Sequence, residues 1–380
     1  MNLRDKLRAV DRPKAAPSPG AAVPTACWEK QISRPAGEFP EAAAVTSELL
    51  SLMTDQPIPH PFDPTRILFL DTETTGLGGG AGTLAFEIGI GHLLADGSFS
   101  VRQLVMLDYP QEASMLARLQ ELSAPFDMLC TFNGSTFDLP LLESRFRMNR
   151  MQPVCLQKPH IDLLHLSRRL WKLRLGSCRL SRLEEVILGQ ARTDDLPGSE
   201  APKRFFDYLR TSRFDLLDDV LLHNEQDIAS LCVLLGRMCA MIAAPERIRE
   251  NADLLSLGRA MEKTRHTEQA KVCYRLIPSG AYRTAAQLRL AAVHRREGQV
   301  DAACQVWQSM TRRGEGGILP YVELAKLAEH RLHDIPLAIA WTEKALRKLA
   351  EPSLRPTEAV QSDRDALQYR YARLLRRRKL

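Results

Sequence analysis

The chain has 380 residues, of which 44% are hydrophobic and 26% charged, as in a folded globular protein. No apolar run approaches the ~20 residues that span a bilayer, and the charged start MNLRDKLRAV lacks the apolar centre of a secretory signal. We therefore expect no membrane association and a cytoplasmic location. The net charge of +6 suits an anionic partner without establishing one.

Eight cysteines are scattered singly along the chain, without a Cys-x-x-Cys pair. This spacing argues against a disulfide framework and against a thiolate zinc site. Buried thiols in a reducing compartment are the expected alternative.

Composition divides the chain into four regions. Residues 1–60 are rich in alanine and proline, so we expect a disordered or loosely packed segment. Residues 61–244 mix strand and helix patterns, and 245–350 show helical patterns alone. Residues 351–380 form a basic C-terminal tail. After Asp365 it reads ALQYRYARLLRRRKL, and this last stretch contains no acidic residue. This basic stretch could bind phosphate or RNA, and it is equally typical of a solvent-exposed helix end.

The second region begins with a short apolar run, ILFL (67–70), which predicts a buried strand. Two further strand patterns cover 83–94 and 98–107, with a hairpin turn at Asp96-Gly97. A helix over 112–122, a strand over 127–132, a helix near Pro140 and a short strand from His160 follow. Residues 163–243 are mostly helical. The order predicts an α/β mixed sheet flanked by helices.

Three helix pairs are expected in the third region, at 250–278, 281–313 and 318–350. Each contains a polar turn followed by a small residue and an aromatic one. Ala270, Ala302 and Ala338 lie 32 and 36 residues apart, close to the ~34-residue period of tetratricopeptide (TPR) repeats. Because the repeat is degenerate, a generic helical bundle remains the alternative to TPR-like helices.

The first motif with chemical meaning is FLDTETTGL (69–77). Alternate side chains of a strand share a face, so Asp71 and Glu73 point together. Adjacent carboxylates repel unless a cation neutralises them, and hard oxygen ligands suit Mg²⁺ or Mn²⁺. Thr74, Thr75 and Gly76 end the strand, and the run GLGGGAG (76–82) allows close backbone approach to a ligand. A DxE triplet alone also occurs at solvated strand ends.

The second motif is TFNGSTFDLPLL (131–142). Asn133 and Gly134 form a tight turn, at which Gly134 would admit a sugar-phosphate backbone and Asn133 or Ser135 could donate hydrogen bonds to it. Asp138 stands near the start of the next helix. Taken alone, this motif fits an ordinary helix cap equally well.

The third motif is LLHNEQDIASL (221–231). His223 and Asp227 are four residues apart and share one helical face. We expect Leu222, Ile228 and Leu231 to pack elsewhere on that helix. In isolation, the default interpretation is a surface His–Asp pair.

Together these motifs resemble the DEDD (DnaQ-like) 3′→5′ exonuclease superfamily, in which four acids bring two metal ions together. The resemblance is closest to the YprB-type branch of RNase H-like proteins. It spans roughly residues 61–240 and includes HIDLLHLSRRLWK and LGSCRLSRLEEVILG. It implies an RNase H-like fold with Asp71, Glu73, Asp138 and Asp227 as ligands of two Mg²⁺ or Mn²⁺ ions.

The implied activity is two-metal hydrolysis of a phosphodiester in single-stranded RNA or DNA. His223 would be the general base, since an imidazole with a pKa near ~6.5 suits proton transfer at neutral pH. One departure concerns its spacing. The superfamily's histidine stands five residues before the last acid, whereas here a histidine takes the four-residue spacing of the tyrosine subclass.

Two features flank these motifs. Asp162 in HIDLL is expected to support the metal ligands. The basic stretch from Arg168 to Arg179 could contact phosphate, whereas Trp171 within it is expected in the core.

The leading hypothesis is therefore a metal-dependent exonuclease. The alternatives are a nucleic-acid-binding RNase H-like scaffold with weak or no catalysis, and an interaction protein that recruits protein partners through its C-terminal helices. These last two are compatible with each other.

Overall fold

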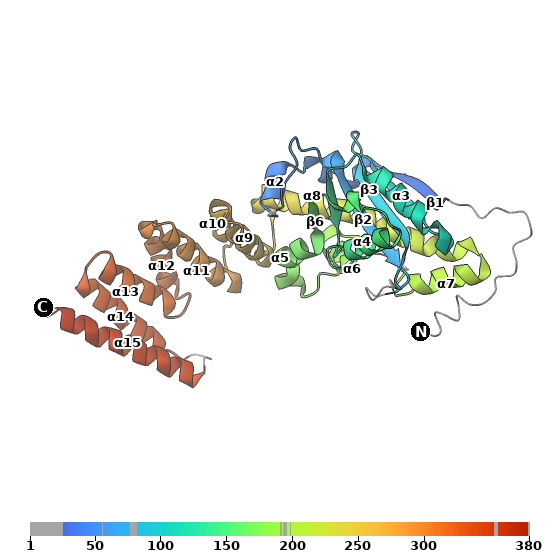
Figure 1. Cartoon of the computed structure of the whole chain (residues 1–380). Coiled ribbons are helices and arrows are strands. Elements are labelled where there is room, and N and C mark those ends of the chain that lie inside the picture. Colours follow the sequence, from blue (N-terminus) through green and yellow to red (C-terminus); the bar gives the residue numbers. More distant parts are fainter. Residues whose placement is uncertain are drawn as a thin grey trace, which may run out of the picture. The chain divides into compact units, whose positions relative to one another are not determined.

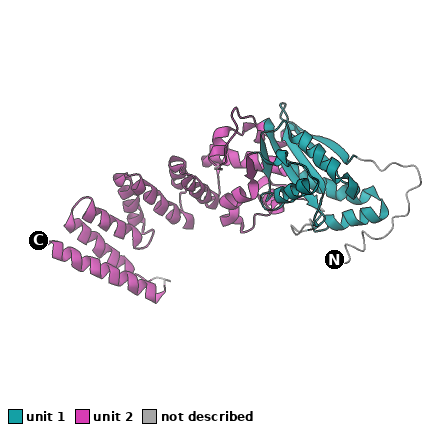
Figure 2. Cartoon of the chain, in the orientation of Figure 1, with its two compact units in different colours: residues 1–36, 65–158, 193–229 teal, residues 37–64, 159–192, 230–380 magenta. Residues whose placement is uncertain are grey.

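A computed structural model describes residues 26–54, 56–76, 82–190, 192, 196–197, 199–352 and 356–378 (Figure 1). The chain forms two compact units, each built from several segments (Figure 2). Unit 1 comprises residues 1–36, 65–158 and 193–229, and unit 2 comprises 37–64, 159–192 and 230–380. Each unit is described by itself.

The described strands form a six-stranded mixed sheet in the order β1-β4-β3-β2-β5-β6. β1, β4, β3 and β2 pair antiparallel in that order, and β2 pairs parallel with β5. This confirms the expected mixed α/β sheet. The strands are β1 (Trp28–Arg34), β2 (Ile67–Thr74), β3 (Ala85–Leu93), β4 (Phe99–Val105), β5 (Met128–Thr131) and β6 (His160–Asp162).

Apolar side chains of the strands and helices build the core of unit 1. Its helices are α3 (Glu112–Ser123), α4 (Asp138–Met148), α7 (Ala201–Thr211) and the first half of α8 (Asp218–Ala243). The rings of Phe86 on β3 and Phe205 on α7 stack with centroids 4.4 Å apart. Gly97 adopts φ +82° in the hairpin between β3 and β4, as the Asp-Gly signal predicts.

The expectation of a disordered or loosely packed segment up to residue 60 is wrong for much of the part that the structure describes. β1 pairs with β4 from Trp28 to Arg34, and the Trp28 ring packs on Phe214 at 5.0 Å. In unit 2, Phe39 is buried and α2 (Ser47–Ser51) is capped by Thr46. A pairing between strands about 70 residues apart leaves no local periodicity, so composition could not reveal it. The same expectation for residues 1–25 falls outside the described residues.

Unit 2 is helical apart from β6. α5 (Leu163–Leu175), α6 (Leu180–Leu183) and a π-helical turn at Glu184–Leu188 precede the second half of α8. The C-terminal helices then follow as successive neighbours, as in a solenoid. They are α9 (Asn251–Lys263), α10 (Thr267–Arg275), α11 (Ala281–Arg296), α12 (Val300–Arg313), α13 (Leu319–His330), α14 (Ile335–Leu349) and α15 (Thr357–Arg378).

Small residues let the paired helices approach closely. A Cβ on Gly258 of α9 would lie 2.5 Å from the ring of Tyr274 on α10, so only glycine leaves space for that ring. The three helix pairs expected from the sequence occur at α9–α10, α11–α12 and α13–α14. These contacts support the TPR-like interpretation over an unordered bundle, and that finer assignment remains our proposal.

The basic tail is partly anchored to its own unit, and residues 376–378 at its described end are exposed. Its helix α15 places Arg370, Arg373 and Arg377 around Glu329 of α13, at N–O distances of 2.9, 2.7 and 2.8 Å. The Glu329 side chain is fully buried. Much of the positive charge of α15 therefore anchors the helix to its own unit.

One described helix, Phe214–Ala243, is long and apolar enough to cross a membrane by length and composition alone. Its most apolar window is 61% buried within the protein. A core helix of a folded domain passes the same test, so this observation supports no membrane assignment.

Candidate metal and nuclease site

Strand register places the first two acids on one face of the sheet. Asp71 of β2 pairs with Gly89 of β3, which in turn pairs with Gln103 of β4. Glu73 pairs with Glu87 in the next row of the same face. The acids lie within β2 itself, which continues to Thr74, rather than beyond its end.

Helix α8 packs directly on this face because two glycines remove the intervening side chains. A Cβ on Gly89 would lie 1.9 Å from Asn224 Oδ1, and a Cβ on Gly91 would lie 2.5 Å from Ile228 Cγ2. Residues 224 and 228 are one helical turn apart, which matches the two-residue spacing of the glycines along β3. This close approach brings the third motif to the first.

His223 lies between two of the candidate acids. Its Nε2 is 3.6 Å from Asp227 Oδ2 and 3.8 Å from Glu73 Oε1. The side chains of His223 and Asp227 are only 13% and 16% exposed, so this is no surface pair. Ile228 and Leu231 are buried as expected, whereas Leu222 is 53% exposed, contrary to the expectation that it packs.

The second motif delivers Asp138 to the start of α4. The residue before it, Phe137, occupies the N-cap position, and Asp138 is the first helical residue. Thr72 Oγ1 donates to Asp138 Oδ1 at 2.5 Å. Asp138 is 7% exposed, so its carboxylate is held inside the protein rather than at a solvated helix end.

The charges of the other three candidate acids act on Asp71. Burial raises the pKa of Asp71 well above its ordinary value, and the charges of Asp227, Asp138 and Glu73 raise it further, in that order. The hydrogen bond from Asn224 Nδ2 to Asp71 Oδ2, 3.0 Å long, acts in the opposite direction. A desolvated carboxylate facing three others needs positive charge to remain ionised.

The oxygen-rich donor set fits Mg²⁺ or Mn²⁺, which prefer hard ligands. Among the described residues, no three His, Cys or acidic side chains already stand at metal-holding distances. The local contacts explain this arrangement, because Asp138 is turned to Thr72 and His223 stands between Glu73 and Asp227.

The predicted substrate-contacting residues have internal contacts. Thr74 Oγ1 donates to Gly76 O at 2.9 Å, and Thr75 Oγ1 accepts from Leu84 N at 3.0 Å. These bonds fix the end of β2 against the start of β3. The rest of the glycine-rich run, residues 77–81, lies outside the described part of the chain.

At the second motif, Asn133 adopts the left-handed φ of 67°. A Cβ on Gly134 would lie 2.3 Å from Thr131 Oγ1, and Gly134 N donates to that oxygen at 3.2 Å. Glycine is therefore required here for internal packing, whereas the sequence suggested room for a substrate backbone. Ser135 is exposed, which is compatible with substrate contact.

The flanking residues in unit 2 have structural roles. Asp162 caps α5, accepting a hydrogen bond from Leu164 N at 3.0 Å. Trp171 is fully buried, as expected, and Arg174 forms a bidentate pair with Asp253. Arg168, Lys172 and Arg179 remain exposed among the basic residues of this stretch.

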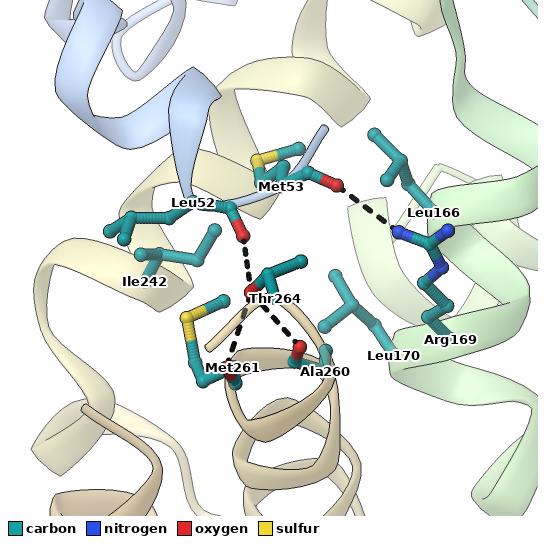
Figure 3. A pocket seen from close by; sticks show the side chains of 9 residues that line it. All are labelled: Leu52, Met53, Leu166, Arg169, Leu170, Ile242, Ala260, Met261 and Thr264. Carbon is teal, nitrogen blue, oxygen red and sulfur yellow. Dashed lines mark hydrogen bonds between the residues drawn. The ribbon is translucent and has the colours of Figure 1, made fainter. Parts of the chain in front are cut away.

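A small apolar cavity in unit 2 offers no room for a nucleotide (Figure 3). Its volume of about 20 Å³ suits a single water molecule. Thr264 Oγ1 reaches Leu52 O at 3.4 Å, and Arg169 reaches Met53 O at 3.2 Å. The cavity is thus a packing junction between α2, α5 and α9.

Three polar residues of the site escaped the sequence reasoning: Thr72, Gln103 and Asn224. Gln103 is fully buried and donates to Leu221 O at 2.6 Å and to Glu87 Oε1 at 2.9 Å. A signal existed in Gly89 and Gly91, whose alternation on a buried strand indicates a helix in close contact.

The fold and the converging acids define an RNase H-like domain, and comparison with known proteins agrees. A sequence model of the RNase_H superfamily matches residues 68–239 of the chain. The chain is also 30% identical over 326 residues to the uncharacterized protein YprB of Bacillus subtilis (strain 168), an alignment covering 82% of this chain and 78% of that protein. The chain therefore belongs to the YprB-type family of RNase H superfamily proteins, which indicates a role connected with nucleic acids.

Proposed function

We propose that this protein is a metal-dependent nuclease that hydrolyses phosphodiester bonds of single-stranded nucleic acid, removing nucleotides in the 3′→5′ direction. The observation that carries the proposal is the geometry that gathers Asp71, Glu73, Asp138 and Asp227 from β2, α4 and α8 in one largely buried cluster. A folded protein gains no stability from such mutual repulsion, so a cationic ligand accounts for it best. The direction of cleavage follows from the resemblance to DEDD exonucleases.

In this proposal, Asp71, Glu73, Asp138 and Asp227 hold two divalent cations. When bound, the cations polarise the scissile phosphate, lower the pKa of the attacking water and offset charge on the leaving oxygen. Thr72 orients the Asp138 carboxylate through its hydroxyl. Asn224 holds one oxygen of Asp71.

His223 would accept the proton of the attacking water. Its Nε2 lies between Glu73 and Asp227, so two carboxylates favour the imidazolium that forms on proton uptake. The four-residue spacing to Asp227 keeps both side chains on one face of α8. The exposed arginines of α5 and the C-terminal helices are candidates for binding nucleic acid and protein partners, respectively.

End-labelled single-stranded RNA and DNA, incubated with the full-length protein and Mg²⁺, Mn²⁺ or EDTA, test the proposal. Asp71→Ala, purified identically, serves as the control. We expect the wild type to shorten 5′-labelled strands one nucleotide at a time when Mg²⁺ or Mn²⁺ is present. We expect no shortening with EDTA or with Asp71→Ala. Tight binding without cleavage under every metal condition would contradict it and favour an RNase H-like scaffold instead.

A further inference from the structure

A row of polar groups crosses three neighbouring strands beneath α8. Asp71, Gly89 and Gln103 are register partners on β2, β3 and β4 and point to the same face. The central position has no side chain. Asn224 of α8 fills that space, with its Oδ1 1.9 Å from where a Cβ of residue 89 would stand.

From this position Asn224 can contact both neighbours of Gly89. Its Nδ2 donates to Asp71 Oδ2 at 3.0 Å. Its Oδ1 faces Gln103 Nε2 at 3.5 Å. Because Asp71 Oδ2 accepts the 3.0 Å bond, the NH₂ group of Asn224 faces Asp71 and its carbonyl oxygen faces β4.

Gln103 itself has fixed partners. It donates to the backbone oxygen of Leu221, one turn before Asn224, at 2.6 Å, and it lies opposite Glu87 Oε1 at 2.9 Å. Asn224 and Gln103 are both fully buried, so water cannot replace these bonds readily. The amide of Asn224 therefore has one stable orientation.

We propose that Asn224 is a positioning residue that fixes the Asp71 carboxylate for cation binding. The inference rests on the proposed function in taking Asp71 as a metal ligand. The hydrogen bond occupies one oxygen of Asp71 and restrains the rotation of the carboxylate, so the other oxygen would be available to a cation. A preoriented ligand loses less conformational freedom on binding than a mobile one.

Asn224→Leu in the full-length protein tests this role, because leucine keeps the branched shape and removes the donor. The matched control is Asn149→Leu, since Asn149 also donates to a carboxylate, Glu112 Oε2 at 2.9 Å, on a different element. Mn²⁺ binding is measured by calorimetry, and nuclease activity is measured separately over a range of Mn²⁺ concentrations. Urea unfolding confirms that each variant is folded.

The expected result is Mn²⁺ binding about tenfold weaker in Asn224→Leu and unchanged in Asn149→Leu, with cleavage by Asn224→Leu restored at high Mn²⁺. If the leucine variant does not fold, Asn224→Ser, which is smaller and cannot reach Asp71, is expected to show the same weakening. Wild-type affinity in a folded Asn224 variant overturns the inference, as does a wild-type protein that binds no Mn²⁺. If the wild type binds Mn²⁺ without cleaving, the nuclease proposal fails while the affinity comparison still decides the role of Asn224.

Discussion

Asn224 Oδ1 lies 1.9 Å from the position that a Cβ of residue 89 would take, so the Asn224 side chain of α8 fills the space that a side chain at Gly89 of β3 would need. This relationship determines how closely α8 approaches the sheet. It places His223 beside Glu73, and Asn224 beside Asp71. The candidate site thus depends on a residue with no side chain.

Gly89→Ala is expected to lower the free energy of unfolding by about 1–3 kcal/mol, because the added methyl group forces the whole Asn224 amide to move. Urea denaturation measures the change. Gly82→Ala is the control, since a Cβ at residue 82 meets nothing within 4 Å. Equal losses in the two variants would show that α8 does not pack on β3 as described.

Asp71→Asn is expected to have opposite effects with and without metal. Without divalent ions it should raise the melting temperature at neutral pH, because folding then no longer requires a carboxyl group to take up a proton or to keep its charge beside three other acids. With Mn²⁺ it should abolish the rise in melting temperature that binding gives the wild type. Asp215→Asn, at an exposed acid paired with Arg213, should respond to Mn²⁺ like the wild type. A full Mn²⁺ response in Asp71→Asn would remove Asp71 from the ligand set.

Glu87→Gln should stabilise the protein increasingly as pH rises. Burial, and then the charge of Glu73, raises the pKa of Glu87 well above the ordinary 4.5. The neutral form is thus favoured in the folded state, so its contribution to stability is complete below pH 4.5 and is lost as pH rises toward the raised pKa. The glutamine variant has no such loss.

The difference in unfolding free energy between Glu87→Gln and the wild type should therefore grow above pH 4.5, by at most about 1.4 kcal/mol per pH unit. Urea titrations at pH 5, 6.5 and 8 measure it. Glu121→Gln, whose side chain is 70% exposed, is the control. A difference that stays constant with pH would mean that Glu87 ionises normally in the folded protein.

Glu329→Gln should loosen α15. The substitution keeps the size of the side chain and removes the buried negative charge that three arginines share. Because those arginines are partly exposed, we expect a modest loss of about 1–2 kcal/mol in unfolding free energy. Hydrogen exchange over 357–378 should accelerate.

The matched substitution is Glu351→Gln, since Glu351 is largely exposed and pairs with Lys348. It should leave exchange in α15 unchanged. Wild-type exchange in Glu329→Gln would show that apolar contacts alone hold the last helix.

His223→Gln should lower the cleavage rate about 100-fold while Mn²⁺ affinity changes little, as removal of a general base predicts. Single-turnover kinetics at saturating Mn²⁺ separate the two quantities. Loss of Mn²⁺ binding without a rate defect at saturation would instead make His223 an orienting group for Glu73 or Asp227.

Local patterns in the sequence predicted much of the sheet and the positions of the four acids. ILFL before Asp71 marks a buried strand, and the His223–Asp227 spacing marks one helical face. The features that the sequence did not predict depend on contacts between segments far apart in the chain. The pairing of β1 with β4 and the docking of three arginines on Glu329 join residues tens of positions apart. The Thr72–Asp138 and Asn224–Asp71 bonds likewise arise only after the elements pack.

The central claim is that four carboxylates from β2, α4 and α8 act together on a phosphodiester. The most direct measurement compares metal-dependent nucleotide release from a single strand by the wild type and by Asp71→Asn, Glu73→Gln, Asp138→Asn and Asp227→Asn, with Asp215→Asn as control. We expect release by the wild type and the control, and a loss of at least about 100-fold in each of the four variants. Comparable release by the wild type and all four variants would contradict the account.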